Sequence, residues 1–175
     1  MRLFTAIDLP EEMLDQFRDF LVRLRPLAKL RWSPVENLHI TTKFIGEWPE
    51  SRIEEMKTAL GSVNSQPIEI SVGGLGWFPD VHRPRVFWAG VHAGRPLTML
   101  AHSTEQAVAR LYVPVEKRQF SPHLTLARMQ AAVPLDDLRK PMGDPDFGTF
   151  IAFSFFLYLS SNGRYSKLAE FPLNS

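Results

Sequence analysis

Fourteen Pro and ten Gly are spread along the whole chain of 175 residues, which restricts it to short helices and strands joined by many turns. Between these turns, runs of strand-forming residues alternate with segments whose apolar residues recur every three or four positions, as they do in amphipathic helices. The predicted order of elements is β-α-β-α-β-β-α-β-α-β-β. This mixture predicts an α+β fold with largely antiparallel sheets and helices packed outside them.

Three segments carry specific local predictions. Asp8 ends an apolar strand and is predicted to cap the helix that follows, with Pro10 in its first turn. The stretch 73–80, rich in Gly and aromatic residues, is predicted to be a loop between two strands. The most apolar run, 150–159, is predicted to be one strand buried on both faces.

Composition narrows the possible functions. Twenty Lys and Arg balance nineteen Asp and Glu, so a net charge of +1 argues against a surface built for long nucleic acid, although a local basic cluster remains possible. The absence of Cys excludes disulfides, thiolate catalysis and Cys-based metal sites. We expect residues 1–175 to form a single domain of two interleaved lobes. The first residues are too polar for a secretory signal, so we expect a monomeric cytoplasmic protein that does not bind membranes.

The pattern His-apolar-Thr occurs twice, as His39-Ile40-Thr41 and His123-Leu124-Thr125. Five His and eight Thr would produce roughly 0.2 such triplets by chance. Residues i and i+2 of a strand share a face, so each His would lie beside its Thr. Two imidazoles can act as base and acid in one displacement, and Thr hydroxyls can donate hydrogen bonds to phosphate oxygens. The alternative is that both His are partly buried structural residues.

These motifs and their flanks resemble the 2H phosphoesterases, specifically the bacterial and archaeal RNA 2′,3′-cyclic phosphodiesterases, also called 2′-5′ RNA ligases. The resemblance covers nearly the whole chain. It rests on residues 2–10, Trp32, 36–41, 44–47, 84–91, 121–128, 159–160 and 163–165. One departure is Thr42, where the family usually has a large apolar residue. By strand alternation Thr42 points away from the groove, so we expect a local change of packing and no loss of function.

The resemblance implies a bilobal 2H phosphoesterase fold, in which two sheets are related by pseudo-two-fold symmetry around a central groove. It also implies an enzyme that hydrolyses the 2′,3′-cyclic phosphate of RNA ends or nucleosides to a 2′-phosphomonoester. His39 would be the proton donor and His123 the proton acceptor, while Thr41 and Thr125 would bind the phosphate oxygens. The same site could join a cyclic phosphate to a 5′-hydroxyl without ATP. No metal and no cofactor are implied.

Arg128 is the remaining substrate-binding candidate carried over from the family. It lies five residues after His123, so strict alternation would aim it at the opposite face of the strand. To reach the phosphate it must lie where the strand ends or bends. The alternative is a solvated Arg at a strand end.

Two other functions remain open: a 2′-5′ oligonucleotide phosphodiesterase and a non-catalytic protein that binds RNA ends. Four aromatic residues are candidates for stacking a base, although at least half of them are expected in the core: Trp77, Phe78, Phe87 and Trp88. The three other histidines are expected to be structural or exposed: His82, His92 and His102.

Overall fold

The computed structural model describes residues 1–174, which form two antiparallel sheets. The first sheet has the order β3-β1-β8-β9 and contains β1 (Arg2–Asp8), β3 (His39–Glu47), β8 (Ser154–Ser161) and β9 (Arg164–Pro172). The second has the order β2-β6-β5-β4-β7 and contains β2 (Arg31–Trp32), β4 (Ile68–Phe78), β5 (Val86–His92), β6 (His123–Arg128) and β7 (Asp146–Ala152).

Four α-helices within residues 1–174 lie outside these sheets: α1 (Glu11–Leu24), α2 (Ile53–Gly61), α3 (Gly94–Ala109) and α4 (Asp136–Met142). Short 3₁₀ turns cover Arg25–Leu27, Val35–Asn37 and Glu50–Arg52. The prediction of an α+β fold with antiparallel sheets and outer helices is therefore confirmed. None of these helices is both long and apolar enough to cross a membrane.

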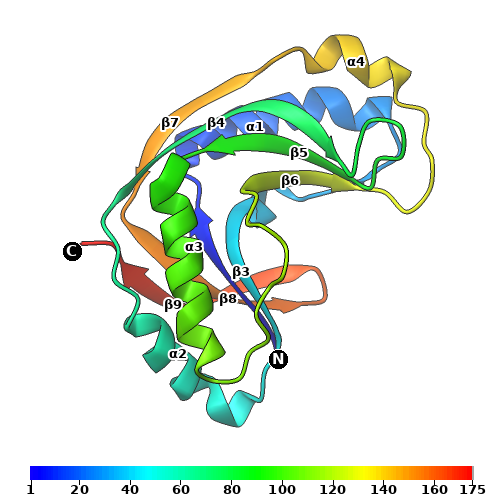
Figure 1. The fold of residues 1–175 in the computed structure, drawn as a ribbon. Helices are drawn as coiled ribbons and strands as arrows, with labels where there is room; N and C mark the ends of the chain where they lie inside the picture. The colour runs from blue at the N-terminus through cyan, green and yellow to red at the C-terminus, as the bar shows by residue number, and fades with distance from the viewer. Residues whose placement is uncertain (175) are drawn as a thin grey trace.

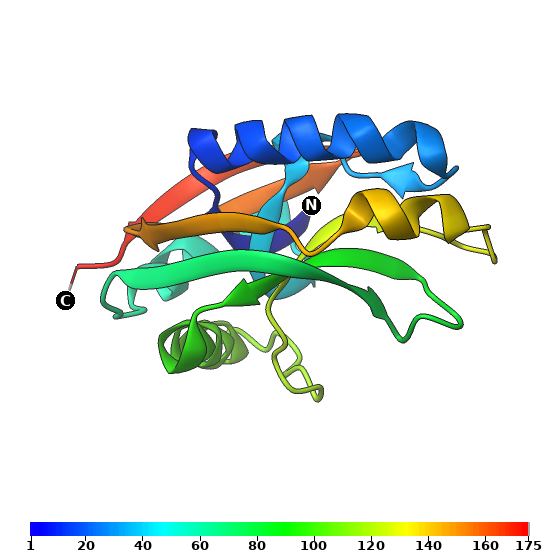
Figure 2. The same cartoon turned by 90° about the horizontal axis from the view of Figure 1, so that it is seen from above.

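The helices pack across the two sheets and bind them into one core. Helix α1 follows β1 of the first sheet but contacts β7 of the second, where Phe17 stacks on Phe147 with ring centroids 3.9 Å apart. Conversely, α3 follows β5 of the second sheet and contacts β3 of the first. Figure 2 shows α1 and α4 on one side of the molecule and α3 on the other. Side chains from both sheets consequently belong to one continuous apolar cluster.

The start of α1 differs from the prediction. Its N-cap residue is Pro10, which has no side chain able to cap, and the first turn instead carries the acidic Glu11 and Glu12. Acidic residues at this end interact favourably with the helix dipole. Asp8 is the last residue of β1 and makes its contacts across the sheet, so the capping prediction was wrong.

Two further predictions about segments were wrong. The stretch 73–80 is largely strand, because β4 continues through Phe78 and pairs with β5. The apolar run 150–159 is divided between β7 and β8, and Phe153 between them is 64% exposed. At Phe153 the chain leaves the second sheet and enters the first, so the run is not one strand buried on both faces.

A β-bulge in β3 changes which of its residues share a face. Thr41 lies opposite Ala6 and Lys43 lies opposite Thr5, so Thr42 between them has no partner in the ladder. One extra residue resets the alternation of side chains beyond it. Phe44, three residues after Thr41, therefore lies on the face of His39 and Thr41 and is 67% exposed.

Strand β6 carries a bulge at the equivalent position. Thr125 lies opposite Trp88 and Ala127 lies opposite Phe87, which leaves Leu126 without a partner on β5. In both strands the extra residue is the third after the histidine. The pseudo-two-fold symmetry of the fold thus extends to the irregularities of the two strands that carry the His-x-Thr motifs.

Gly76 allows the indole of Trp88 to lie across the groove face of the second sheet. The two residues are opposite each other on β4 and β5, and a Cβ atom at position 76 would overlap the Trp88 ring. We predict that Gly76→Ala lowers the free energy of unfolding by about 1–3 kcal/mol, as other overpacked sites do. Denaturant unfolding checks this against Gly61→Ala, whose Cβ meets nothing within 4 Å. Equal stability of the two variants would contradict the prediction.

Candidate active site

The two His-x-Thr motifs lie on β3 and β6, which contact each other where the two sheets meet. Ile40 and Leu124 are fully buried in the core, whereas the His and Thr on either side of them are half-buried on the opposite face. In Figure 1 both strands border the inner side of the curved molecule. The two motifs therefore lie on contacting strands, with the His and Thr of each on the face opposite the core.

Each histidine is oriented by the same hydrogen bond. Nδ1 of His39 donates to the carbonyl of Asn37 at 2.9 Å, and Nδ1 of His123 donates to the carbonyl of Ser121 at 2.9 Å. A carbonyl can only accept, so the proton of each neutral imidazole is on Nδ1. Nε2 of each ring is left to take up or release a proton at the groove.

His39 has a carboxylate beside its reactive nitrogen. Asp8 lies opposite His39 in the β1–β3 ladder, with its Oδ1 3.5 Å from Nε2 of His39. The Tyr158 hydroxyl donates to Oδ1 of Asp8, and Nζ of Lys167 donates to Oδ2 at 2.7 Å. These two donors come from the C-terminal hairpin of β8 and β9, which therefore fixes the position of the carboxylate.

Aromatic rings enclose His39 on the other sides. Its ring centroid lies 4.5 Å from that of Tyr158, 5.8 Å from that of Tyr165 and 6.4 Å from that of Phe4. The side chain is only 10% exposed. Phe4 and Tyr158 belong to a small apolar cluster on this face, separate from the main core.

Burial lowers the pKa of His39 below its ordinary value. The hydrogen bond to Asn37 and the charge of Asp8 oppose this effect, whereas the charge of Lys167 adds to it. Burial also raises the pKa of Tyr158, and the hydrogen bond to Asp8 raises it further. Tyr158 therefore remains a protonated donor to Asp8 throughout the range in which imidazoles titrate.

The surroundings of His123 are different. Phe78 meets its ring edge-on at 5.0 Å between centroids, and Trp88 lies 5.1 Å from Phe78. No carboxylate lies within 4 Å of His123 in residues 1–174. The other two aromatic candidates, Trp77 and Phe87, stack on each other at 4.4 Å and belong to the core. Two of the four aromatics therefore border the groove.

Arg128 shares the face of His123 and Thr125. It lies opposite Val86, whereas Thr125 lies opposite Trp88, and these two positions of β5 are an even number of residues apart. The bulge at Leu126 thus resolves the conflict with strict alternation. Arg128 ends β6, is exposed, and has no carboxylate within 4 Å in the part of the chain that the structure describes.

Thr42, the residue that departs from the family pattern, is buried at the bulge of β3. Its Oγ1 is hydrogen-bonded to Oγ1 of Thr5 at 2.7 Å, so both buried hydroxyls are satisfied. Residues 1–174 contain no cluster of three or more His, Cys, Asp or Glu that could hold a metal. His82, His92 and His102 are exposed, and Nε2 of His92 donates to the carbonyl of Gly73 at 3.2 Å.

Sequence reasoning missed Asp8, Tyr158 and Lys167 as parts of this site. The contact between Asp8 and Tyr158 spans 150 residues, and no local pattern records it. A weak signal existed, because a carboxylate at the end of an apolar strand needs a partner.

The electrostatics of His39 lead to a measurable prediction. Replacing Lys167 by Met keeps an unbranched aliphatic side chain but removes the ammonium group, which lies 3.8 Å from the centroid of the Phe156 ring and whose charge lowers the pKa of His39. Loss of that charge favours the imidazolium, so the titration midpoint of His39 should move to higher pH. NMR titration of the ring protons measures it, and the midpoint of His123 is the internal control. An unchanged or lower midpoint for His39 would contradict this arrangement.

Known proteins are similar to this chain in both sequence and fold. A family model described as "LigT like Phosphoesterase" matches residues 7–88, which include the first His-x-Thr motif. A relative from Archaeoglobus fulgidus, named RNA 2′,3′-cyclic phosphodiesterase, is 34% identical over 149 residues, or 85% of this chain and 84% of the relative. A protein of the same name from Methanocaldococcus jannaschii is 32% identical over 164 residues, or 92% of each chain.

Solved structures extend the similarity over nearly the whole chain. The crystal structure of a Thermus thermophilus protein, TT0787, has a TM-score of 0.79 and 30% identity, covering 99% of this chain and 98% of that one. The crystal structure of Escherichia coli LigT complexed with 3′-AMP has a TM-score of 0.80 and 27% identity over the same shares. With both motifs on contacting strands and relatives of this identity aligned along most of their length, the chain belongs to the LigT-like phosphoesterase family.

Proposed function

We propose that this protein hydrolyses the 2′,3′-cyclic phosphate of RNA ends or nucleosides to a 2′-phosphomonoester by acid-base catalysis with two histidines. The observation that carries the proposal is the matched orientation of His39 and His123. In both rings the backbone holds Nδ1 and leaves Nε2 at the groove. The names of the relatives from A. fulgidus and M. jannaschii support the same reaction.

The reaction needs one base and one acid on opposite sides of phosphorus. Nε2 of His123 takes a proton from water as the water oxygen attacks phosphorus. The bond between phosphorus and O3′ breaks, and His39 gives the proton on its Nε2 to O3′. The phosphate remains on O2′. A ribose 5′-hydroxyl in place of water would form a 2′-5′ linkage by the same steps, with no ATP.

The difference between the two histidines supports these roles. The protonated form of His39 is stabilised by Asp8, whose Oδ1 lies 3.5 Å from Nε2, whereas His123 has no such carboxylate in residues 1–174. Burial lowers the pKa of His39 and so makes its protonated form a stronger acid. His123, which has no carboxylate beside it in residues 1–174, takes the role of base in this proposal.

The remaining groups stabilise charge. Thr41 and Thr125 share the faces of the two histidines, and their hydroxyls can donate to the non-bridging oxygens as charge develops there. Arg128, two register positions beyond Thr125, supplies a positive charge on the same face. Phe78 and Trp88 border the groove next to His123 and offer surfaces on which a base can stack.

The reaction and the two histidines are tested together. We expect the protein to convert a nucleoside 2′,3′-cyclic monophosphate to the 2′-phosphate in the presence of EDTA, as followed by phosphorus NMR. His39→Ala and His123→Ala should each lower kcat by about 10²–10⁴-fold, the usual contribution of general acid-base catalysis. His102→Ala, which changes an exposed histidine on α3, should retain full activity.

Other outcomes would point elsewhere. Loss of activity in EDTA that a divalent ion restores would contradict a metal-free reaction. Cleavage of a 2′-5′ linked dinucleotide without turnover of cyclic phosphate would indicate a 2′-5′ phosphodiesterase. Tight binding of an RNA with a cyclic phosphate end, recovered unchanged, would indicate a non-catalytic binding protein.

The pH dependence follows from the same roles. His123 must be neutral, so activity falls as the pH decreases, and His39 must be protonated, so activity falls as the pH increases. The plot of kcat/KM should therefore be bell-shaped between about pH 5 and 8. A flat profile across this range, with the chemical step rate-limiting, would rule out the two-histidine mechanism.

A further inference from the structure

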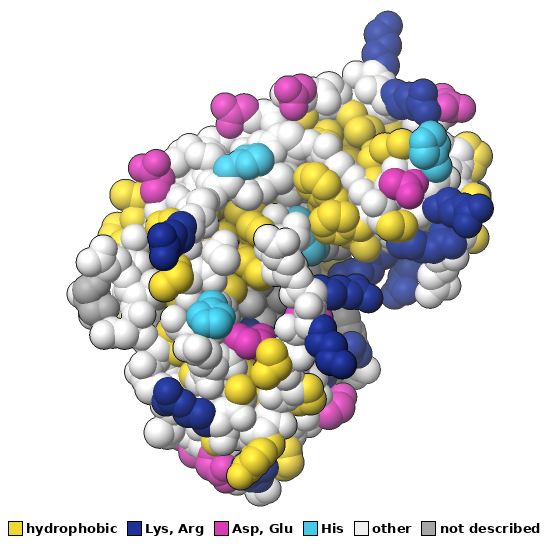
Figure 3. All heavy atoms as spheres, in the orientation of Figure 1, with side chains coloured by type: hydrophobic (Ala, Val, Ile, Leu, Met, Phe, Trp, Pro, Cys, Tyr) yellow, Lys and Arg dark blue, Asp and Glu magenta, His cyan; other side chains and the backbone are white. Residues whose placement is uncertain are grey.

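A basic hollow lies at the end of β6 and has Arg128 in its lining. It has a volume of about 480 Å³ and lies between the turn after α1, strand β2 and the segment after β6. Its basic residues are Arg25, Lys29, Arg31 and Arg128. Figure 3 shows Lys and Arg side chains gathered around the hollowed region where the two halves of the molecule meet. In a chain with a net charge of +1, this is a local concentration of positive charge.

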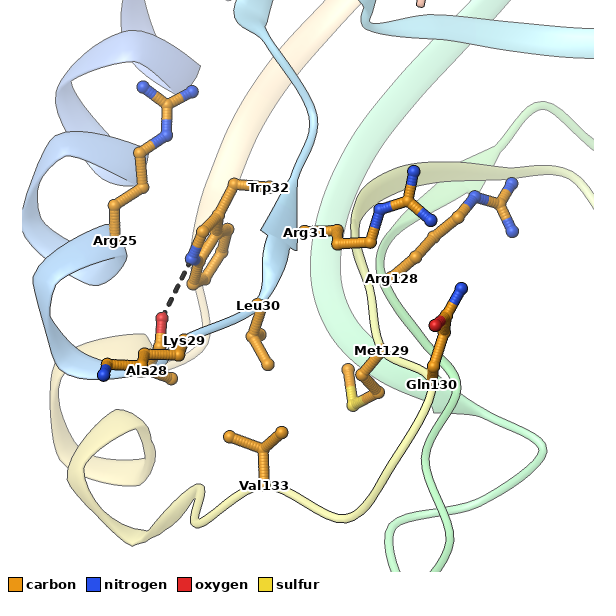
Figure 4. Close-up of a pocket in the computed structure, with 10 residues that line it drawn as sticks. All are labelled: Arg25, Ala28, Lys29, Leu30, Arg31, Trp32, Arg128, Met129, Gln130 and Val133. Atoms are coloured by element: carbon orange, nitrogen blue, oxygen red, sulfur yellow. Dashed lines mark hydrogen bonds between the residues drawn. The ribbon is translucent and has the colours of Figure 1, made fainter.

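Arg31 and Arg128 form an unusual pair at the centre of this hollow. They lie directly opposite each other in the β2–β6 ladder, where like charges destabilise a sheet. Neither has a carboxylate within 4 Å in residues 1–174. In Figure 4 the two guanidinium groups extend in the same direction, and the amide of Gln130 points toward them. The pair therefore presents several unused donors to one place.

Arg25 has a different role in the same hollow. It donates to the carbonyl of Ser33 at 3.2 Å, and in Figure 4 it lies on the other side of Trp32 from Arg31. Trp32 in turn donates from Nε1 to the carbonyl of Ala28 at 3.1 Å. These bonds hold the strand that carries Arg31 in place, and they leave Arg31 and Arg128 side by side on neighbouring strands without an acidic partner in residues 1–174.

The position of the pair relative to the motifs indicates which anion it binds. Thr125 and Arg128 lie opposite Trp88 and Val86, which are two residues apart on β5. Thr125 and Arg128 are therefore about 7 Å apart along the strand direction. Arg31 is one strand further out, about 5 Å away. Successive phosphates of a single RNA strand are separated by a comparable distance. A phosphate at Thr125 thus places the neighbouring one within reach of the two arginines.

We infer that Arg31, together with Arg128, binds the phosphodiester that joins the terminal nucleotide to its 5′ neighbour. The inference rests on the proposed function and adds the class of substrate: an RNA end of at least two nucleotides is used in preference to a cyclic mononucleotide. Two planar guanidinium groups suit this role because each can donate two parallel hydrogen bonds to phosphate oxygens.

The test compares kcat/KM for two substrates that end in the same nucleoside 2′,3′-cyclic phosphate. One is the cyclic mononucleotide and the other a dinucleotide with one internal phosphodiester. We expect the protein to prefer the dinucleotide, and Arg31→Ala to reduce the preference about tenfold or more, as expected for hydrogen bonds to a charged group. Arg31→Lys should give an intermediate preference. Arg95→Ala, which removes an exposed positive charge at the start of α3, is the matched control.

Two further measurements separate the phosphate from the extra base. A dinucleotide with an uncharged methylphosphonate linkage should lose the preference in the wild-type protein. The slope of log kcat/KM against log salt concentration for the natural dinucleotide should become shallower by about 0.7 in Arg31→Ala, as for one lost phosphate contact.

Each contrary result has a distinct meaning. A wild-type protein with no preference for the dinucleotide, or a preference that survives the methylphosphonate, would overturn the inference. Equal losses of both activities in Arg31→Ala would also overturn it, because they would indicate a structural role for Arg31. If the wild-type protein turns over neither substrate, the proposed function itself fails.

Discussion

The site depends on the contact between β3 and β6, which belong to different sheets. Ser33 fastens β6 from one side, because its N–H donates to the carbonyl of Leu126 at 2.9 Å and its hydroxyl to that of Thr125 at 3.1 Å. A buried ion pair fastens β3, where Nζ of Lys43 lies 2.9 Å from Glu105 of α3. Breaking a buried pair by removing one partner is strongly destabilising. The motifs are therefore placed by contacts outside the groove.

The two sides of the groove differ in how they handle charge. On the first sheet, the carboxylate of Asp8 beside His39 also accepts hydrogen bonds from Tyr158 and from the positively charged Lys167. On the second sheet, Arg31 and Arg128 have no acidic partner in residues 1–174. Symmetry of the backbone is thus combined with asymmetry of the side chains. In the proposed function, the first side controls a proton and the second receives the phosphates of the substrate.

The sequence predicted the elements and motifs whose signals are local. The apolar stripe of α1 and the alternation in His39-Ile40-Thr41 follow from periodicity alone, and both are found in the structure. What could not be predicted depends on contacts between distant segments. Asp8 looked like a helix cap because its partners Tyr158 and Lys167 are about 150 residues away. The apolar run 150–159 divides at Phe153 because its first part joins the second sheet and the rest joins the first sheet. The hydropathy of the two parts is similar, so it does not reveal this division.

The bulge residues Thr42 and Leu126 affect which substitutions and deletions these two strands can accept. Substitution at either position alters packing locally, as the hydroxyl pair of Thr42 and Thr5 illustrates. Deletion of either residue would remove the bulge and leave strict alternation, with each residue beyond it still opposite its present partner in the ladder. After loss of Leu126, for example, Arg128 would remain opposite Val86 and on the face of His123. A related strand that is one residue shorter at the bulge can therefore present the same side chains on the same face, so a one-residue alignment gap at these two positions does not by itself indicate a changed site.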